Sequence, residues 1–244
     1  MTDRGASALT RLADRLTVGR SSMSWRNGAL EIDVDEISSL PLVSRMRGRI
    51  VLTPDAVTNV ELPLSADGAH VWRPFAPTAT IEVDLEAPGW RWSGHGYFDA
   101  NFGTRRLEKD FTGWTWARFP TDEGALCMYR ATLLSGTAIQ ATVLFGTDGT
   151  MEVIPDYASA SLPTTRWALA RSVGADPGTV PRQVMPMLGG PFYNRAVVTT
   201  TLAGRQVTGV HETLDLRRYA SRVVKYMVMT RVPRRGGAVS LARA

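Results

Sequence analysis

The chain has 244 residues, near the length at which one hydrophobic core gives way to two, so we expect two modules rather than one large barrel. Hydrophobic residues make up 44% and charged residues 21%, which excludes a disordered chain, and the single cysteine, Cys127, excludes an internal disulfide and a multi-cysteine metal cluster. The net charge of +5 comes largely from residues after 216, where zinc-finger, RNP and basic-helix patterns are all missing, so we expect no nucleic-acid partner.

The amino-terminal residues do not predict a targeting segment. Residues 1–16 carry charged side chains throughout and lack the apolar core of a signal peptide. Apolar residues within 7–16 fall near helical spacing, and no later stretch approaches 18 uncharged apolar residues. We therefore expect a soluble-type protein with no membrane span, and a cytoplasmic location.

The rest of the first half reads as sheet. Asn27-Gly28 separates two short alternating runs and predicts a hairpin. Strands are expected at residues 49–52, 60–64 and 78–85. In the last of these, apolar and acidic residues alternate, which indicates one buried and one solvent-exposed face. Pro88-Gly89 ends this series, and Trp90 starts another strand that continues to Tyr97.

A second β series follows an irregular, charged stretch at residues 101–111, which we interpret as the crossing between two modules, residues 1–112 and residues 113–244. Many short strands with turns every 8 to 12 residues favour a β sandwich or barrel. The strands expected in the second module span residues 114–116, 125–132, 138–145, 151–154, 166–171, 195–202 and 226–232.

Common catalytic motifs are missing from the sequence. It contains no dinucleotide-binding glycine pattern, no Walker loop, no serine nucleophile elbow and no His-Glu-x-x-His. The three histidines, His70, His95 and His211, have no metal-ligand spacing. We therefore expect neither a metal nor a cofactor.

Aromatic and ionisable residues meet in one segment. Five of the seven tryptophans and two of the three histidines fall between His70 and Trp116. Residues two apart on a strand share a face, so Asp99 shares an aromatic-rich face with Tyr97 and His95. The other pairs of this kind are His70 with Trp72, Trp90 with Trp92, and Trp114 with Trp116.

A carboxyl group on such a surface has a chemical use if the surface is closed to water. Desolvation raises the pKa of the carboxyl, so Asp99 would stay protonated and act as an acid. Aromatic faces stabilise a nearby cation by about 0.5 to 2 kcal/mol, which suits carbocation chemistry on an alkene. The alternative is structural: tryptophan pairs often fill a core, and Asp99, Asn101 and Gly103 could form a turn.

The motifs in this segment resemble those of the carotenoid 1,2-hydratase family, also called hydroxyneurosporene synthase. The resemblance covers nearly the whole chain. It rests on the sequence stretches at residues 70–75, 94–103, 107–118, 181–185 and 210–212. Members usually carry an additional amino-terminal segment before the position of Met1, and a first barrel without it would have an exposed edge.

The resemblance implies two tandem lipocalin-like β barrels of the calycin type. It also implies a cofactor-free hydro-lyase that adds water across the terminal 1,2 double bond of an acyclic carotenoid such as neurosporene or lycopene. Asp99 would protonate C2 and leave a tertiary cation at C1, Trp72 and Tyr97 would shield the cation, and His70 would orient the acid or return its proton. We expect Trp92, His95, Trp114 and Trp116 to line the substrate site.

The substrate would be nearly insoluble in water, so the enzyme would have to collect it from a membrane. We expect peripheral contact with the inner or photosynthetic membrane through the basic residues 217–235, although a solvated basic tail is the alternative. Two other functions remain open at this point. One is a lipocalin-like carrier of apolar ligands, which has no need of Asp99, and the other is a related cofactor-free cyclase.

Overall fold

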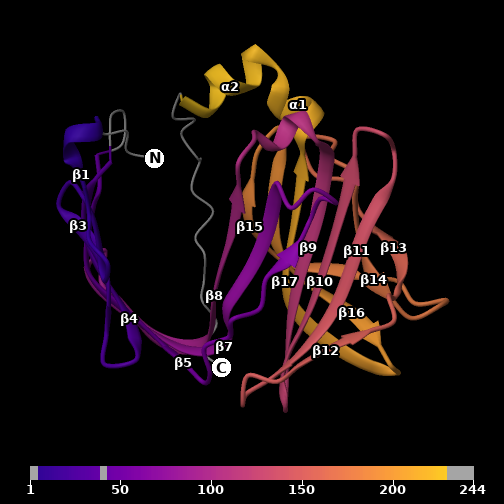
Figure 1. Ribbon diagram of the computed structural model, residues 1–244, viewed down its shortest axis with the longest axis horizontal. Coiled ribbons are helices and arrows are strands. Elements are labelled where there is room, and N and C mark those ends of the chain that lie inside the picture. The colour runs from indigo at the N-terminus through magenta and orange to yellow at the C-terminus, as the bar shows by residue number, and fades with distance from the viewer. Residues whose placement is uncertain (1–4, 39–42, 230–244) are drawn as a thin grey trace.

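The computed structural model describes residues 5–38 and 43–229 and shows a mainly β protein built from antiparallel sheets (Figure 1). We call its eight-stranded sheet the N-terminal sheet and its seven-stranded sheet the C-terminal sheet. The N-terminal sheet contains β1 (Leu9–Arg11), β2 (Arg15–Val18), β3 (Ser21–Arg26), β4 (Ala29–Ile37), β5 (Arg45–Pro54), β6 (Leu62–Pro63), β7 (His70–Ala87) and β8 (Trp90–Gly103).

The C-terminal sheet has the strand order β12-β11-β10-β9-β17-β16-β15, and a two-stranded sheet, β13-β14, covers part of it. Short 3-10 helices lie at Ala6–Ala8 and Leu107–Lys109, and helices α1 (Leu216–Ala220) and α2 (Arg222–Met229) follow the last strand. The strands are β9 (Phe111–Thr121), β10 (Gly124–Leu133), β11 (Ala138–Gly146), β12 (Met151–Ile154), β13 (Ala158–Leu162), β14 (Arg171–Ala175), β15 (Arg182–Gly189), β16 (Tyr193–Leu202) and β17 (Arg205–Asp215).

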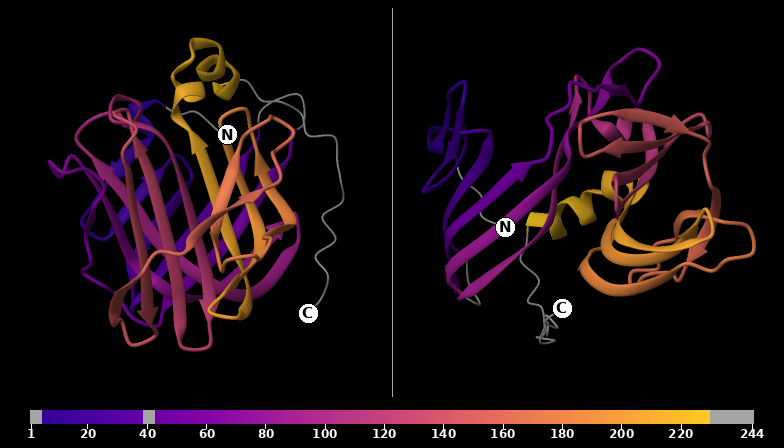
Figure 2. Two further views of the ribbon diagram at one scale, coloured as in Figure 1. Left: turned by 90° about the vertical axis from the view of Figure 1, so that its right-hand side faces the viewer. Right: turned by 90° about the horizontal axis from the view of Figure 1, so that it is seen from below.

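Strands β7 and β8 connect the two sheets. They form a long antiparallel pair whose register shifts between Arg73 and Ala76 and again between Ala76 and Ala79. Such irregularities bend a strand pair and increase its twist. The Ala79–Ala87 part of β7 therefore pairs with β5, while its beginning packs on the C-terminal sheet, as the view from below in Figure 2 also shows.

The main hydrophobic core lies between these sheets rather than inside either one. Trp72 and Leu64 come from the N-terminal part of the chain, and they pack with Phe111, Tyr129 and Phe145 of the C-terminal sheet. Trp72 is 1% exposed, so its large apolar surface is fully removed from water. This shared core fixes the position of β7 and β8 on the C-terminal sheet.

The predicted hairpin is confirmed. Asn27 and Gly28 have φ of 51° and 77°, the left-handed values that a two-residue type I′ turn requires, and they join β3 to β4. Most other expected strands coincide with observed ones. The expectation of tandem closed barrels is not confirmed, because the strand pairings within residues 5–38 and 43–229 form open paths.

Three local expectations were wrong. Residues 7–16 form a 3-10 turn and strands β1 and β2 rather than a helix. Residues 166–170 form a turn because Thr165 Oγ1 accepts hydrogen bonds from the amides of Trp167 and Leu169, which replaces strand pairing. Residues 226–229 belong to helix α2, and residues 230–232 lie outside the described part of the chain.

The change from one sheet to the other falls between Gly103 and Phe111, within the predicted crossing. The division into modules at residue 112 stays a prediction, since the two sheets share a core. Within the described residues, neither helix has the length and apolar character that a membrane crossing requires.

We predict that Gly209→Ala lowers the free energy of unfolding by about 1–3 kcal/mol through overpacking. An added Cβ would overlap the carbonyl oxygen of Arg118 and lie 2.7 Å from Phe119 Cδ1, where the backbone of β9 cannot move without disturbing its pairing with β17. Gly94→Ala is the control, because its Cβ would meet no atom closer than 3.9 Å. Urea denaturation measures both variants, and an equal loss in the two would contradict the prediction.

Candidate functional site

One face of the C-terminal sheet carries charged residues inside the shared core. Trp116 on β9 is in register with Tyr129 on β10 and Glu212 on β17, and Glu212 is in register with Arg195 on β16. Residues directly opposite each other in a sheet point to the same side. Tyr129, Trp116, Glu212 and Arg195 thus form a row across the sheet, which we call the transverse row.

The neighbouring row contains Arg118 and Cys127, which are also in register and are 5% and 1% exposed. Arg118 Nε donates a hydrogen bond to the carbonyl oxygen of Pro77 at 2.7 Å. Burial lowers the pKa of the Arg118 guanidinium and raises the pKa of the Cys127 thiol to about 12, so the thiol stays neutral. Arg118 therefore brings a positive charge into a largely apolar layer.

Asp99 faces these rows from β8. Its Oδ2 accepts a hydrogen bond of 2.8 Å from Trp72 Nε1, and the Trp72 ring stacks on Tyr129 with the ring centres 5.9 Å apart. Burial raises the pKa of Asp99, while the Trp72 N–H and the charges of Arg195 and Arg118 act in the opposite direction. The carboxyl group is therefore more readily protonated than an exposed aspartate, as the sequence led us to expect.

Tyr97 connects Asp99 with the transverse row. Its hydroxyl accepts a hydrogen bond of 2.6 Å from Arg195 Nη2, and its ring centre lies 5.1 Å from that of Trp116. Burial raises the pKa of the Tyr97 hydroxyl, so the phenol remains neutral. Arg195 Nη1 lies 3.3 Å from Glu212 Oε1, which links Tyr97 through one guanidinium to a second carboxylate.

Glu212 is the second carboxyl group of the site. Burial raises its pKa, and the charge of Arg195 and a hydrogen bond with Tyr193 oppose that rise. The charge of Asp99 raises it further, which indicates that the two carboxyls interact electrostatically.

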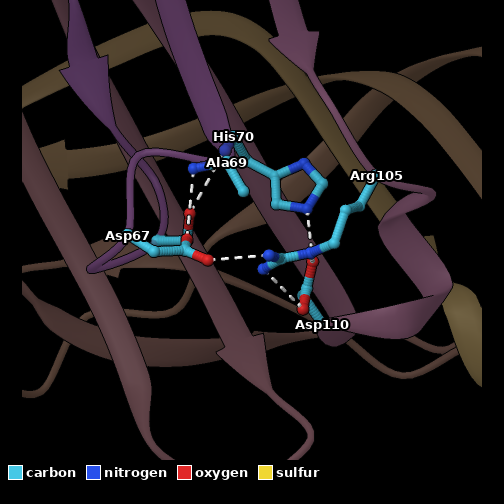
Figure 3. A network of polar contacts seen from close by, with 6 residues as sticks. Asp67, Ala69, His70, Arg105 and Asp110 are labelled. Carbon is cyan, nitrogen blue, oxygen red and sulfur yellow. Dashed lines mark hydrogen bonds and ion pairs between the residues drawn. The ribbon is translucent and has the colours of Figure 1, made fainter.

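His70 lies next to this site but has other partners (Figure 3). Its Nε2 lies 2.6 Å from Asp110 Oδ2, and Arg105 bonds both Asp110 and Asp67, with distances of 2.7 to 3.1 Å. His70 is 1% exposed and lines an open pocket of about 590 Å³ together with Tyr219 and others. The ring of His70 is therefore oriented by Asp110 and not by Asp99.

The structure brings some of the predicted residues together and leaves others apart. Trp116 belongs to the transverse row, and the half-buried Trp114 lies 6.3 Å from Tyr129 between ring centres. Trp92 is 44% exposed and His95 is also exposed. They lie on the part of β8 that extends beyond the C-terminal sheet, with Trp92 about 23 Å along the strand from Asp99.

Sequence reasoning missed the charged residues of the C-terminal sheet. Arg195 stands between Tyr193 and Val197 on one face of its strand, and Glu212 similarly stands between Val210 and Leu214. A charge in the middle of an apolar strand face was the available signal. Among residues 5–38 and 43–229, no group of three or more histidine, cysteine or acidic side chains could hold a metal ion.

The family model of the carotenoid hydratase CrtC matches residues 1–240, which confirms the resemblance found in the motifs. The chain is 54% identical to the acyclic carotenoid 1,2-hydratase of Cereibacter sphaeroides, with 97% of this chain and 85% of the relative covered. It is 48% identical to the enzyme of the same name from Rhodobacter capsulatus, with 97% and 84% covered.

The fold is also similar to that of a solved protein of low sequence identity. The crystal structure of a putative AttH from Nitrosomonas europaea matches with a TM-score of 0.58 at 12% identity. The match covers 86% of this chain and 72% of that one.

We predict that Trp72→Phe raises the pKa of Asp99. The Trp72 N–H bonds the Asp99 carboxyl and lowers its pKa, so loss of this donor favours the protonated form. Trp116→Phe is the control, because Trp116 Nε1 has no partner within the described part of the chain. Carbon NMR titration of the Asp99 carboxyl measures both, and an unchanged or lower pKa in Trp72→Phe would refute the assignment.

Proposed function

Because the chain belongs to the carotenoid hydratase CrtC family, we propose that Asp99 is the acid of an acyclic carotenoid 1,2-hydratase. The protein is a hydro-lyase that adds water to the 1,2 double bond of an acyclic carotenoid. The observation that carries the assignment of the acid is the buried Asp99 carboxyl, which accepts a hydrogen bond of 2.8 Å from the neutral indole N–H of Trp72.

The reaction starts with transfer of the Asp99 proton to C2 of the terminal double bond of a substrate such as neurosporene or lycopene. The electron pair of the double bond forms the new C–H bond, and a tertiary cation is left at C1. Trp72 and Tyr97 present aromatic faces that stabilise this cation, and the new Asp99 carboxylate is a nearby counter-charge. Water then adds at C1.

The other predicted residues have supporting roles in this proposal. Trp114 and Trp116, which pack beside Tyr129 and Tyr97, contact the polyene end. His70 helps to return a proton from solvent, since it lines the open pocket and its ring is held by Asp110. We no longer place Trp92 and His95 at the reacting end, because both are exposed on the distant part of β8.

The tandem lipocalin-like arrangement and the boundary at residue 112 are part of the same proposal. They are supported by the two successive antiparallel sheets and by the overall fold similarity to the AttH protein. A carrier or a cyclase on this fold is a weaker alternative, because a carrier needs no buried acid and the named relatives are hydratases.

We also propose a peripheral membrane contact, at the cytoplasmic face of the inner or photosynthetic membrane, through the end of the chain. Helix α2 exposes Val223 and Tyr226, which are 67% and 72% exposed, next to the basic Arg222. Apolar side chains flanked by basic ones suit the surface of an anionic bilayer. Three further arginines of the basic segment, Arg231, Arg234 and Arg235, lie outside the described residues.

We predict that Asp99→Asn lowers hydration by at least about 100-fold, because the amide cannot supply the proton. The Asn oxygen can still accept the Trp72 N–H, so the site keeps its shape. The folded-state pKa of Asp99 is raised, so ionisation of Asp99 lowers the free energy of unfolding as pH rises. Asp99→Asn cannot ionise, and its free energy of unfolding at neutral pH should therefore be at least as high as that of wild type.

The assay uses purified protein and lycopene in liposomes without added cofactor, and follows a mass gain of one water. Asp84→Asn, on an exposed part of β7, is the control and should keep its activity. Full hydration by Asp99→Asn would show that Asp99 is not the acid.

We predict weaker binding to anionic liposomes at low salt when four arginines near the end of the chain are replaced by glutamine. Each contributes on the order of 1 kcal/mol near such a surface, and the effect should disappear at high salt. The variant changes Arg217, Arg222, Arg231 and Arg234. The control changes the same number of charges on the N-terminal sheet, at Arg20, Arg45, Arg47 and Arg49. Equal binding by both variants would argue against this contact surface.

A further inference from the structure

Two buried donors beside Glu212 lack a hydrogen-bond partner. Trp116 Nε1 and Arg195 Nε are both buried, and neither has a partner among the described residues. A buried donor without a partner destabilises the fold unless a water or ligand accepts its hydrogen bond. Glu212 is in register with both Trp116 and Arg195, so the two donors belong to the side chains that flank Glu212 on one face of the sheet.

We propose that Glu212 is the general base for the attacking water, and that Trp116 Nε1 and Arg195 Nε hold this water beside it. The proposal rests on the proposed hydration and adds a second catalytic group to it. Water that attacks the C1 cation becomes an oxonium and must lose a proton to a base. A water bonded to Glu212 transfers that proton as the C–O bond forms.

The surroundings of the two carboxyls suit opposite roles. Glu212 has the Arg195 guanidinium 3.3 Å away, and this positive charge stabilises the Glu212 carboxylate against the effect of burial. Asp99 accepts its side-chain hydrogen bond from the uncharged Trp72 N–H, which opposes the rise that burial causes in the Asp99 pKa without cancelling it. Neighbouring carboxyls placed in different environments divide into one acid and one base.

The positions of the two groups also fit opposite sides of the reacting bond. Asp99 approaches from β8, whereas Glu212 lies on β17 in the facing sheet. Tyr97, two residues from Asp99 on β8, packs against Trp116, which is in register with Glu212, with ring centres 5.1 Å apart. A terminal double bond next to these rings would have the acid on one side and the water on the other.

The step balances without a further reactant. The Asp99 proton forms the C2–H bond, the water oxygen forms the C1–O bond, and one water proton passes to the Glu212 carboxylate. Glu212 then releases its proton and Asp99 regains one through solvent. Each turnover consumes one water and no net proton.

The test uses azide, an anionic nucleophile that needs no base. Glu212→Ala should hydrate lycopene in liposomes at least about 100-fold more slowly than wild type. With sodium azide it should form the tertiary azide, seen as a mass gain of hydrazoic acid, and with formate it should recover alcohol formation. Glu82→Ala, on an exposed part of β7, is the control and should form only alcohol.

Three results separate this proposal from the proposed function. Asp99→Asn should form neither alcohol nor azide, because no cation arises; alcohol formation by this variant would overturn the acid and not the base. A folded Glu212→Ala that keeps a tenth or more of its activity, or that azide and formate both fail to rescue, would overturn the role of Glu212. If Glu212→Ala does not fold, the isosteric Glu212→Gln is subjected to the same azide test.

Discussion

The hydrogen bond from Trp72 to Asp99 is the contact on which the rest of the site depends. It joins β7 to β8 at the position where the pair bends onto the C-terminal sheet, and it holds a carboxyl group inside an aromatic core. The indole N–H is uncharged, so it hydrogen-bonds the carboxyl without supplying a positive charge that would stabilise the carboxylate. An arginine at the position of Trp72 would have fixed Asp99 as a carboxylate and removed its use as an acid.

The transverse row places aromatic and charged side chains around the buried Asp99 carboxyl. Arg195 bonds the Tyr97 hydroxyl and lies 3.3 Å from Glu212, so one guanidinium holds both an aromatic ring beside Asp99 and the second carboxyl. Arg118 is fixed by the carbonyl oxygen of Pro77 and adds a second positive charge. These charges limit the rise of the pKa of Asp99 that burial causes.

The sequence was sufficient for the local features and insufficient for those that depend on contacts between the sheets. Asn27-Gly28 determined its hairpin because a two-residue turn with left-handed φ is a local requirement. The proximity of Asp99 to tryptophan and tyrosine could likewise be anticipated from strand alternation. His95 shares a face with Asp99 in sequence, yet it lies where no second sheet covers the strand. Glu212 and Arg195 could be placed only after the register of β9, β16 and β17 was known.

The shared core has a consequence for the order in which the protein acquires its chemistry during synthesis. Asp99 and Trp72 leave the ribosome well before β16 and β17, the strands that carry Arg195 and Glu212. Until those strands pair with β9, Arg195 and Glu212 do not flank Trp116, and the charges around Asp99 are incomplete. A nascent chain therefore carries the Trp72–Asp99 pair before it carries the transverse row, and the environment of Asp99 is complete only when the last strand has joined the sheet.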